Sequence, residues 1–304
     1  MSTETFMGWV PPDQRDAETQ ATVETVVGGM PPFMIVGAVG GDDNAGKRVV
    51  LWDYAKKVNG GKHLPTFRQE IGDCVSMGAA NAVNYLACME IIRLGEREEY
   101  RPAFQPYLYG ISRVQIGGGR INGDGSIGAW AAEGARKYGV LFTTDEGVPT
   151  YSGSVARKWG NRPGPPQSMI DQAKDNLVHS TALVTSYEQV RDAICNGYPV
   201  SVASNRGFQM QPRIDRGKSW GVPSGSWAHQ MCFIGVDDDS ARPGCYLINS
   251  WGENAHGTPA DDAPPGGFWV DAATVTQMVK QQDSFAWSQF DGFPANKLDF
   301  SLIG

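Results

Sequence analysis

The chain has 304 residues, of which 41% are hydrophobic and 19% charged, a composition typical of a folded globular protein with a large core. Its formal net charge of -7 and its lack of a Lys/Arg-rich run argue against a nucleic-acid partner. Apolar stretches such as residues 33–39 are much shorter than the roughly 20 residues that cross a bilayer. We therefore expect neither a membrane span nor a membrane partner.

The first residues, MSTETFMGWVPPDQRD, have neither the basic start nor the apolar segment of a secretion signal. Five cysteines occur without a CxxC pair, which favours neither a disulfide framework nor a structural zinc site, and no other metal site is expected. Reduced thiols and a cytoplasmic or otherwise non-secreted location follow from this pattern. Cys232 and Cys245 lie on neighbouring predicted strands and would pair only if oxidised.

The first half of the chain begins with a predicted N-terminal extension or arm over residues 1–65, polar and without a helical period at its start. Apolar residues then recur at helical spacing from Cys74 to Gly95, which predicts a central buried helix. A Gly-rich loop at 117–126 leads into a second helical pattern, and a Pro- and Gly-rich stretch at 158–167 predicts a connection between lobes.

The second half of the chain is predicted to consist mostly of strands. After the short helical pattern YEQVRDAICNG come four strand-like runs, PVSVAS, AHQMCFIGVD, GCYLINSWG and GGFWVD. We therefore predict an α+β fold with a helical lobe over residues 66–170 and a β-rich lobe, an antiparallel sheet or barrel, over 171–304.

Cys74 stands where a turn meets the first turn of the predicted central helix, so it is either a packing residue or a nucleophile. His229 opens a predicted strand, from which an imidazole can project at the sheet edge. Asn249 ends the next strand, and antiparallel pairing would bring it near His229. A carboxamide there can fix one imidazole tautomer and leave the other ring nitrogen free to face a thiol.

The stretches QEIGDCVS, AHQMCFIGV and YLINSWGE, in this order, resemble the three active-site blocks of the papain-like cysteine peptidases. GYPVSVAS, INGDGSIGAW and GGFWV resemble lesser blocks of the same family, so the resemblance spans roughly residues 50–290. It implies a divergent member of bacterial or phage type, with two lobes around a cleft and a peptide or protein substrate.

The resemblance also implies roles for individual residues, and the chemistry needs no cofactor. Cys74 would be the nucleophile, His229 the general base and acid, and Asn249 the residue that orients the imidazole. Gln69 would stabilise the oxyanion, and Trp251 would shield the histidine from water. The remaining substrate-cleft residues would be Gly123, Asp124, Gly125, Val200 and Ala228.

Three departures from the family pattern leave alternatives open. Gln69 lies five residues before Cys74 instead of six, where this chain has Arg68, and Val75 replaces an aromatic residue. Asp73 would cap the helix but oppose a thiolate, which we still expect to dominate because the helix N-terminus and an imidazolium favour it. The alternatives are a structural or binding module of a larger, virion-associated assembly, docked through the N-terminal arm, and a thiol amidase or acyltransferase acting on a nonpeptide substrate.

Overall fold

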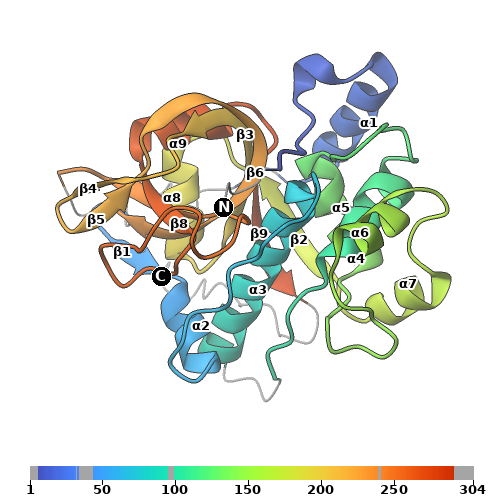
Figure 1. Cartoon of the computed structure of the whole chain (residues 1–304), viewed down its shortest axis with the longest axis horizontal. Coiled ribbons are helices and arrows are strands. Elements are labelled where there is room, and N and C mark those ends of the chain that lie inside the picture. The colour runs from blue at the N-terminus through green and yellow to red at the C-terminus, as the bar shows by residue number, and fades with distance from the viewer. Residues whose placement is uncertain (1–5, 32, 34–43, 95–98, 239–240, 291–304) are drawn as a thin grey trace, which may run out of the picture.

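The computed structural model describes residues 6–31, 33, 44–94, 99–238 and 241–290. Figure 1 shows a β-rich part on the left, a helical part on the right, and the long helix α3 (Cys74–Leu94) passing between them. This is the α+β, two-lobed arrangement that the sequence predicted. The other helical segments are η1 (Pro12–Gln14), α1 (Ala17–Gly28), α2 (Trp52–Val58), α4 (Gln105–Gly110), η2 (Ile111–Ile116), α5 (Gly128–Tyr138), α6 (Gly153–Gly160), α7 (Gln167–Ala173), α8 (Tyr187–Cys195) and α9 (Ala272–Val279).

The strands of the described residues form one sheet in the order β2-β9-β3-β6-β7-β8-β5-β4, with β1 pairing with β6 outside this path. All pairings are antiparallel except a single parallel contact between β5 and β8. The strands are β1 (Arg48–Val50), β2 (Val178–Leu183), β3 (Val200–Phe208), β4 (Arg213–Asp215), β5 (Lys218–Trp220), β6 (Pro223–Asp237), β7 (Gly244–Ile248), β8 (Gly267–Asp271) and β9 (Phe285–Phe290).

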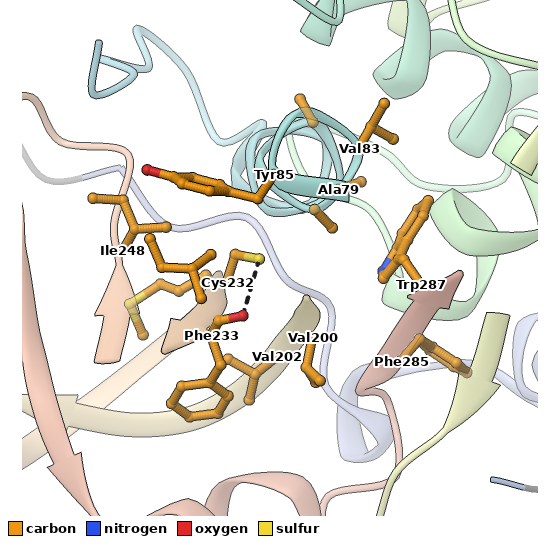
Figure 2. Packing of buried hydrophobic residues seen from close by; sticks show 14 of the residues in the cluster. Ala79, Val83, Tyr85, Val200, Val202, Cys232, Phe233, Ile248, Phe285 and Trp287 are labelled. Carbon is orange, nitrogen blue, oxygen red and sulfur yellow. Dashed lines mark hydrogen bonds between the residues drawn. The ribbon is translucent and has the colours of Figure 1, made fainter. Parts of the chain in front are cut away.

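Helix α3 is buried along its first four turns because small and apolar residues cover all of its faces. Alanines and a glycine let neighbouring elements approach its backbone closely. In Figure 2 its residues Ala79, Val83 and Tyr85 lie over a layer of sheet residues that includes Val202 and Phe233. Residues 74–93 are long and apolar enough to cross a membrane, but 89% of that window is buried inside the fold, which marks a core helix. The expected stop at Gly95 lies outside the described residues.

The N-terminal region is more ordered than the predicted arm. Asp16 caps α1 by accepting the backbone N–H of Thr19 at 2.7 Å, and α1 packs against α5. Strand β1 pairs with β6, and α2 packs against α3. The described parts of residues 1–65 therefore belong to the body of the fold.

The cysteines are all free thiols. In the register of β6 and β7, Cys232 lies opposite Ile248, whereas Cys245 lies opposite Val236. The two cysteines sit four positions apart along the ladder, so the pairing considered from the sequence does not fit this sheet.

Candidate active site

Cys74 is the first residue of α3, where backbone N–H groups lack partners within the helix. Its side chain is completely buried, and its Sγ accepts the backbone N–H of Gln230 at 3.4 Å. Burial raises the pKa of the Cys74 thiol to about 12, although the N–H groups of Gln230, Gly8 and Val75 favour the thiolate. Burial in this structure therefore favours the neutral thiol, against the thiolate that was expected from the sequence.

His229 lies in β6 opposite Ser204 of β3 and is fully buried. Its Nε2 lies 2.8 Å from Asn249 Oδ1, and its Nδ1 has no hydrogen-bond partner among the described residues. Gln230, which follows it along β6, is the residue whose backbone N–H contacts Cys74 Sγ, whereas no hydrogen bond joins His229 Nδ1 to that sulfur. Burial lowers the pKa of His229 to about 4, which keeps the imidazole neutral at neutral pH.

Asn249 directly follows β7 and has no exposed surface. Its Oδ1 accepts the N–H of Ser250 at 2.7 Å, and its Nδ2 lies 2.9 Å from His256 Nε2. His256 lies in a turn, but only 3% of it is exposed, because aromatic rings enclose it.

Trp251 lies over His229, with ring centroids 4.7 Å apart and planes inclined by 33°. Gln69 is also buried nearby: its Oε1 accepts the Ser250 hydroxyl at 2.6 Å, and its Nε2 donates to Ile71 O at 2.8 Å. Arg68, at the position where the family usually has glutamine, is exposed. Gln69 is thus the glutamine that the fold turns toward the loop of Asn249.

Asp73 was expected to be an exposed helix cap, but its side chain is fully buried. Its Oδ2 accepts the Tyr151 hydroxyl at 3.1 Å, and its Oδ1 has no partner among the described residues. Burial raises the pKa of Asp73 to about 8. The carboxyl beside Cys74 is therefore mostly protonated at neutral pH, and it opposes a thiolate less than a charged aspartate would.

The predicted cleft residues divide into two groups. Gly123, Asp124 and Gly125 form a loop near Cys74, in which Asp124 accepts the N–H of Gly72 at 3.3 Å. Ala228 lies immediately before His229. Val200 instead lies in the hydrophobic core (Figure 2), opposite Phe233 and four positions from the residue that faces His229. This buried position, four residues from Ser204 along β3, does not fit the predicted place of Val200 in the substrate cleft.

Residues 6–10, here called the covering segment, lie between the Gly-rich loop and β6. The N–H groups of Gly8 and Trp9 donate to Ala228 O at 3.2 and 3.1 Å. Ser126 donates to Gly8 O at 2.7 Å and accepts from Val10 N at 2.9 Å, so the segment runs parallel to the Ser126 backbone. Phe6 O accepts from Gln69 Nε2 at 3.3 Å and from Trp251 Nε1 at 3.1 Å. The chain thus covers its own thiol with a hydrogen-bonded main chain.

No family model matches the chain, and a search of curated proteins finds no match. Solved structures nevertheless align with most of it. Xylellain, a cysteine protease from Xylella fastidiosa, has a TM-score of 0.56 at 15% identity over 93% of this chain and 91% of its own. The proCathepsin B S9 of Trypanosoma congolense has a TM-score of 0.58 at 11% identity over 92% and 91%. Bromelain from Ananas comosus has a TM-score of 0.53 at 14% identity over 79% and 98%.

The chain has a papain-like fold. The resemblance inferred from the three sequence blocks is confirmed at the level of the fold, which is what similarity at these identities establishes.

The papain-like fold of this chain carries an anchor for the covering segment, Asp283, which precedes β9. Its Oδ2 accepts the indole N–H of Trp9 at 2.6 Å and Arg15 Nη2 at 3.0 Å, in an ion pair with 2% and 0% side-chain exposure. The same carboxylate accepts the N–H groups of Gly128 and Ala129 at the start of α5. One buried carboxylate therefore joins the N-terminal region to the papain-like body.

His256, Asp283 and the covering segment were not predictable from the sequence as parts of the site. His256 lies in the polar run GENAHG, which has the composition of an exposed turn. The covering segment binds mainly through backbone groups, which leave no side-chain pattern to detect. The signal that was present is the apolar run FMGWV at residues 6–10, within an otherwise polar terminus.

Proposed function

We propose that this protein is a cysteine peptidase that hydrolyses peptide bonds through an acyl-enzyme on Cys74. The main support is the hydrogen bond between His229 Nε2 and Asn249 Oδ1, formed one residue along β6 from the N–H that contacts Cys74 Sγ. These contacts support the roles of Cys74 as nucleophile, His229 as base and Asn249 as the group that orients the base. Thiol hydrolysis requires this set of groups.

In the proposed reaction, substrate replaces the covering segment and His229 Nδ1 takes the proton of the Cys74 thiol. The sulfur attacks the carbonyl carbon, and the oxygen becomes negatively charged. The backbone N–H of Cys74 and the Nε2 group of Gln69 are the proposed donors to this oxygen. Contact of Gln69 Nε2 with Phe6 O supports that role, because it places a carbonyl oxygen on this amide.

The tetrahedral intermediate then collapses. The C–N bond breaks, its electron pair stays on nitrogen, and His229 gives that nitrogen its proton, so that an amine leaves and a thioester remains on Cys74. Water next loses a proton to His229 and attacks the thioester. When the C–S bond breaks, the carboxylic acid is released and the sulfur regains its proton. Trp251 over the imidazole would limit the access of other water molecules.

A peptide substrate is favoured over a nonpeptide amide because the site already holds a main chain. Ser126 and Ala228 form backbone hydrogen bonds with Gly8, Trp9 and Val10. Such bonds recognise any extended peptide regardless of its side chains. The backbone contacts that a substrate would need are thus supplied by the Gly-rich loop on one side and β6 on the other.

The covering segment is proposed to hold the enzyme in a resting state. With this segment in place, the thiol and the imidazole are both buried and neutral, and substrate has no access to the sulfur. Trypanosoma congolense proCathepsin B S9 and Tenebrio molitor procathepsin L 3, two of the similar structures, are described as proenzymes. Displacement of the segment would return water to the site and lower the thiol pKa.

A second candidate function is a binding module with a papain-like fold and no turnover. The observation that favours it is the buried Arg15–Asp283 pair, which fastens the N-terminal region next to the occupied site. In this alternative the covering segment stays in place permanently, and partners in a larger assembly use the outer surface.

A peptide library and a panel of nonpeptide amides, each analysed by mass spectrometry, separate these functions. The full-length chain, Gly8→Ala and Cys74→Ser would be compared, with Cys195→Ser as the matched thiol control. We expect peptide products from Gly8→Ala, fewer from the wild type and none from Cys74→Ser. Turnover of nonpeptide amides alone would support the amidase alternative, and no turnover by folded Gly8→Ala would support the binding module.

A further inference from the structure

A continuous line of hydrogen bonds runs from the backbone of Met210 through His256 and Asn249 to His229. His256 Nδ1 lies 2.9 Å from Met210 O, and its Nε2 lies 2.9 Å from Asn249 Nδ2. We propose that His256 is a positioning residue, which fixes the carboxamide of Asn249 and through it the tautomer of His229. The functional part of this proposal rests on the proposed peptidase activity.

The far end of the line has an unambiguous acceptor. A backbone carbonyl cannot donate, so His256 Nδ1 carries the proton that binds Met210 O. A neutral imidazole has one N–H group, which leaves His256 Nε2 with a lone pair. The atom of Asn249 that faces this lone pair must therefore be the N–H₂ group.

The near end has an unambiguous donor. The backbone N–H of Ser250 lies 2.7 Å from the other terminal atom of the Asn249 side chain, which must therefore be the oxygen. Two independent backbone groups, Ser250 N–H and Met210 C=O, thus assign the same orientation to the carboxamide. The oxygen that faces His229 Nε2 can only accept, so His229 carries its proton on Nε2 and a lone pair on Nδ1.

Because Asn249 and His256 are buried, the reversed orientation of the Asn249 carboxamide is strongly disfavoured. Asn249 is 0% and His256 3% exposed, so water does not replace a lost partner. Phe268 contacts the His256 ring edge-on at 4.8 Å between centroids, and Trp227 stacks on it at 6.3 Å. A reversed carboxamide would set its N–H₂ against Ser250 N–H and its oxygen against the His256 lone pair. Both contacts are repulsive.

The backbone N–H of Ser250 binds the side-chain oxygen of Asn249 and does not contact its N–H₂ group. His256 supplies the one acceptor given for Asn249 Nδ2 within the described part of the chain. Without His256, the buried N–H₂ group of Asn249 would lose its partner, and the present orientation of the carboxamide would be less strongly favoured over the reversed one. His256 would therefore act on His229 through Asn249 and have no contact with substrate.

Nitrogen NMR of the full-length chain, labelled with ¹⁵N-histidine, tests the assignment without any need for activity. The chain has only four histidines, which makes assignment by single substitutions practical. We expect His256 as the Nδ1–H tautomer and His229 as the Nε2–H tautomer in the wild type. The Nε2–H form of His256 would overturn the proposal.

Two substitutions then test the coupling. His256→Gln keeps an acceptor and a donor, and it should keep His229 in the Nε2–H form. His256→Ala should give a mixture of His229 tautomers. In the Gly8→Ala background, where Cys74 is accessible, it should also slow alkylation of Cys74 by roughly tenfold, with a shifted pH profile, a smaller loss than removal of the base itself. An unchanged His229 tautomer in folded His256→Ala would contradict the proposal. If Cys74 is not alkylated in any variant, the peptidase proposal fails, while the tautomer pattern still decides the role of His256.

Discussion

Gly8 lies so close to Gly72 that a Cβ atom on Gly8 would stand 1.9 Å from the carbonyl oxygen of Gly72. Gly72 is close to the nucleophile in the chain, and the N–H of Gly8 favours a thiolate at Cys74. Glycine at position 8 thus allows the covering segment to lie against the site.

Gly8→Ala should displace the covering segment, because the new methyl group meets rigid backbone and not a flexible side chain. We expect Cys74 to be alkylated by iodoacetamide at least tenfold faster in this variant than in the wild type, as burial of the thiol is relieved. Peptide mapping by mass spectrometry gives the rate at each cysteine.

The matched control for this change is Gly28→Ala, at the end of α1, where a Cβ would meet nothing within 4 Å. It should leave the rate at Cys74 unchanged. Equal rates in Gly8→Ala and Gly28→Ala would show that the segment does not limit access to the thiol.

Arg15→Ala should destabilise the fold by about 3–5 kcal/mol, because it leaves the buried carboxylate of Asp283 without its cationic partner. Arg120→Ala is the control, since the Arg120–Glu18 pair also ties the N-terminal region to the body but is largely exposed. That pair is worth under about 1 kcal/mol. Urea unfolding of both variants measures the difference, and equal losses would refute the proposed anchor.

Asp73 should make the fold less stable as the pH rises. Its pKa is about 8 in the fold against 3.8 for the ordinary side chain, so between these values the unfolded chain has lost a proton that the folded chain keeps. The free energy of unfolding should therefore fall between about pH 4 and pH 8, by an amount on the order of 5 kcal/mol.

Asp73→Asn should remove this part of the pH dependence, and Asp13→Asn, at an exposed position, should not. Urea unfolding at a series of pH values gives the comparison. A pH dependence that is the same in Asp73→Asn and the wild type would show that Asp73 ionises normally.

The central helix and the strands of the β-rich lobe were predictable because their patterns are local. CVSMGAANAVNYLACMEIIRL has helical spacing of small and apolar residues throughout, and AHQMCFIGVD has the composition of a buried strand. Helix α1 was missed because AETQATVETVVG is rich in Thr and Val, which disfavour helices. Its cap at Asp16 and its packing against α5 outweigh that preference.

The contact between His229 and Asn249 was predictable from two motifs and from strand pairing, and the catalytic roles of these residues and of Cys74 stay predictions. The state of the site did not follow, because it depends on contacts between distant parts of the chain. Asp73 has the sequence position of an exposed helix cap, but it is buried and accepts a hydrogen bond from Tyr151; Cys74, which was expected to be a thiolate, is also buried. Burial of this kind has no local sequence signature.

The most direct test of the account is the labelling of Cys74 by a peptidyl epoxide in the Gly8→Ala background, with and without His229→Ala. We predict one adduct per chain, located on Cys74, and a loss of at least 100-fold in the labelling rate when His229 is removed. A folded Gly8→Ala protein that forms no adduct at Cys74, or forms it equally fast without His229, would contradict the assignment of Cys74 as a nucleophile activated by His229.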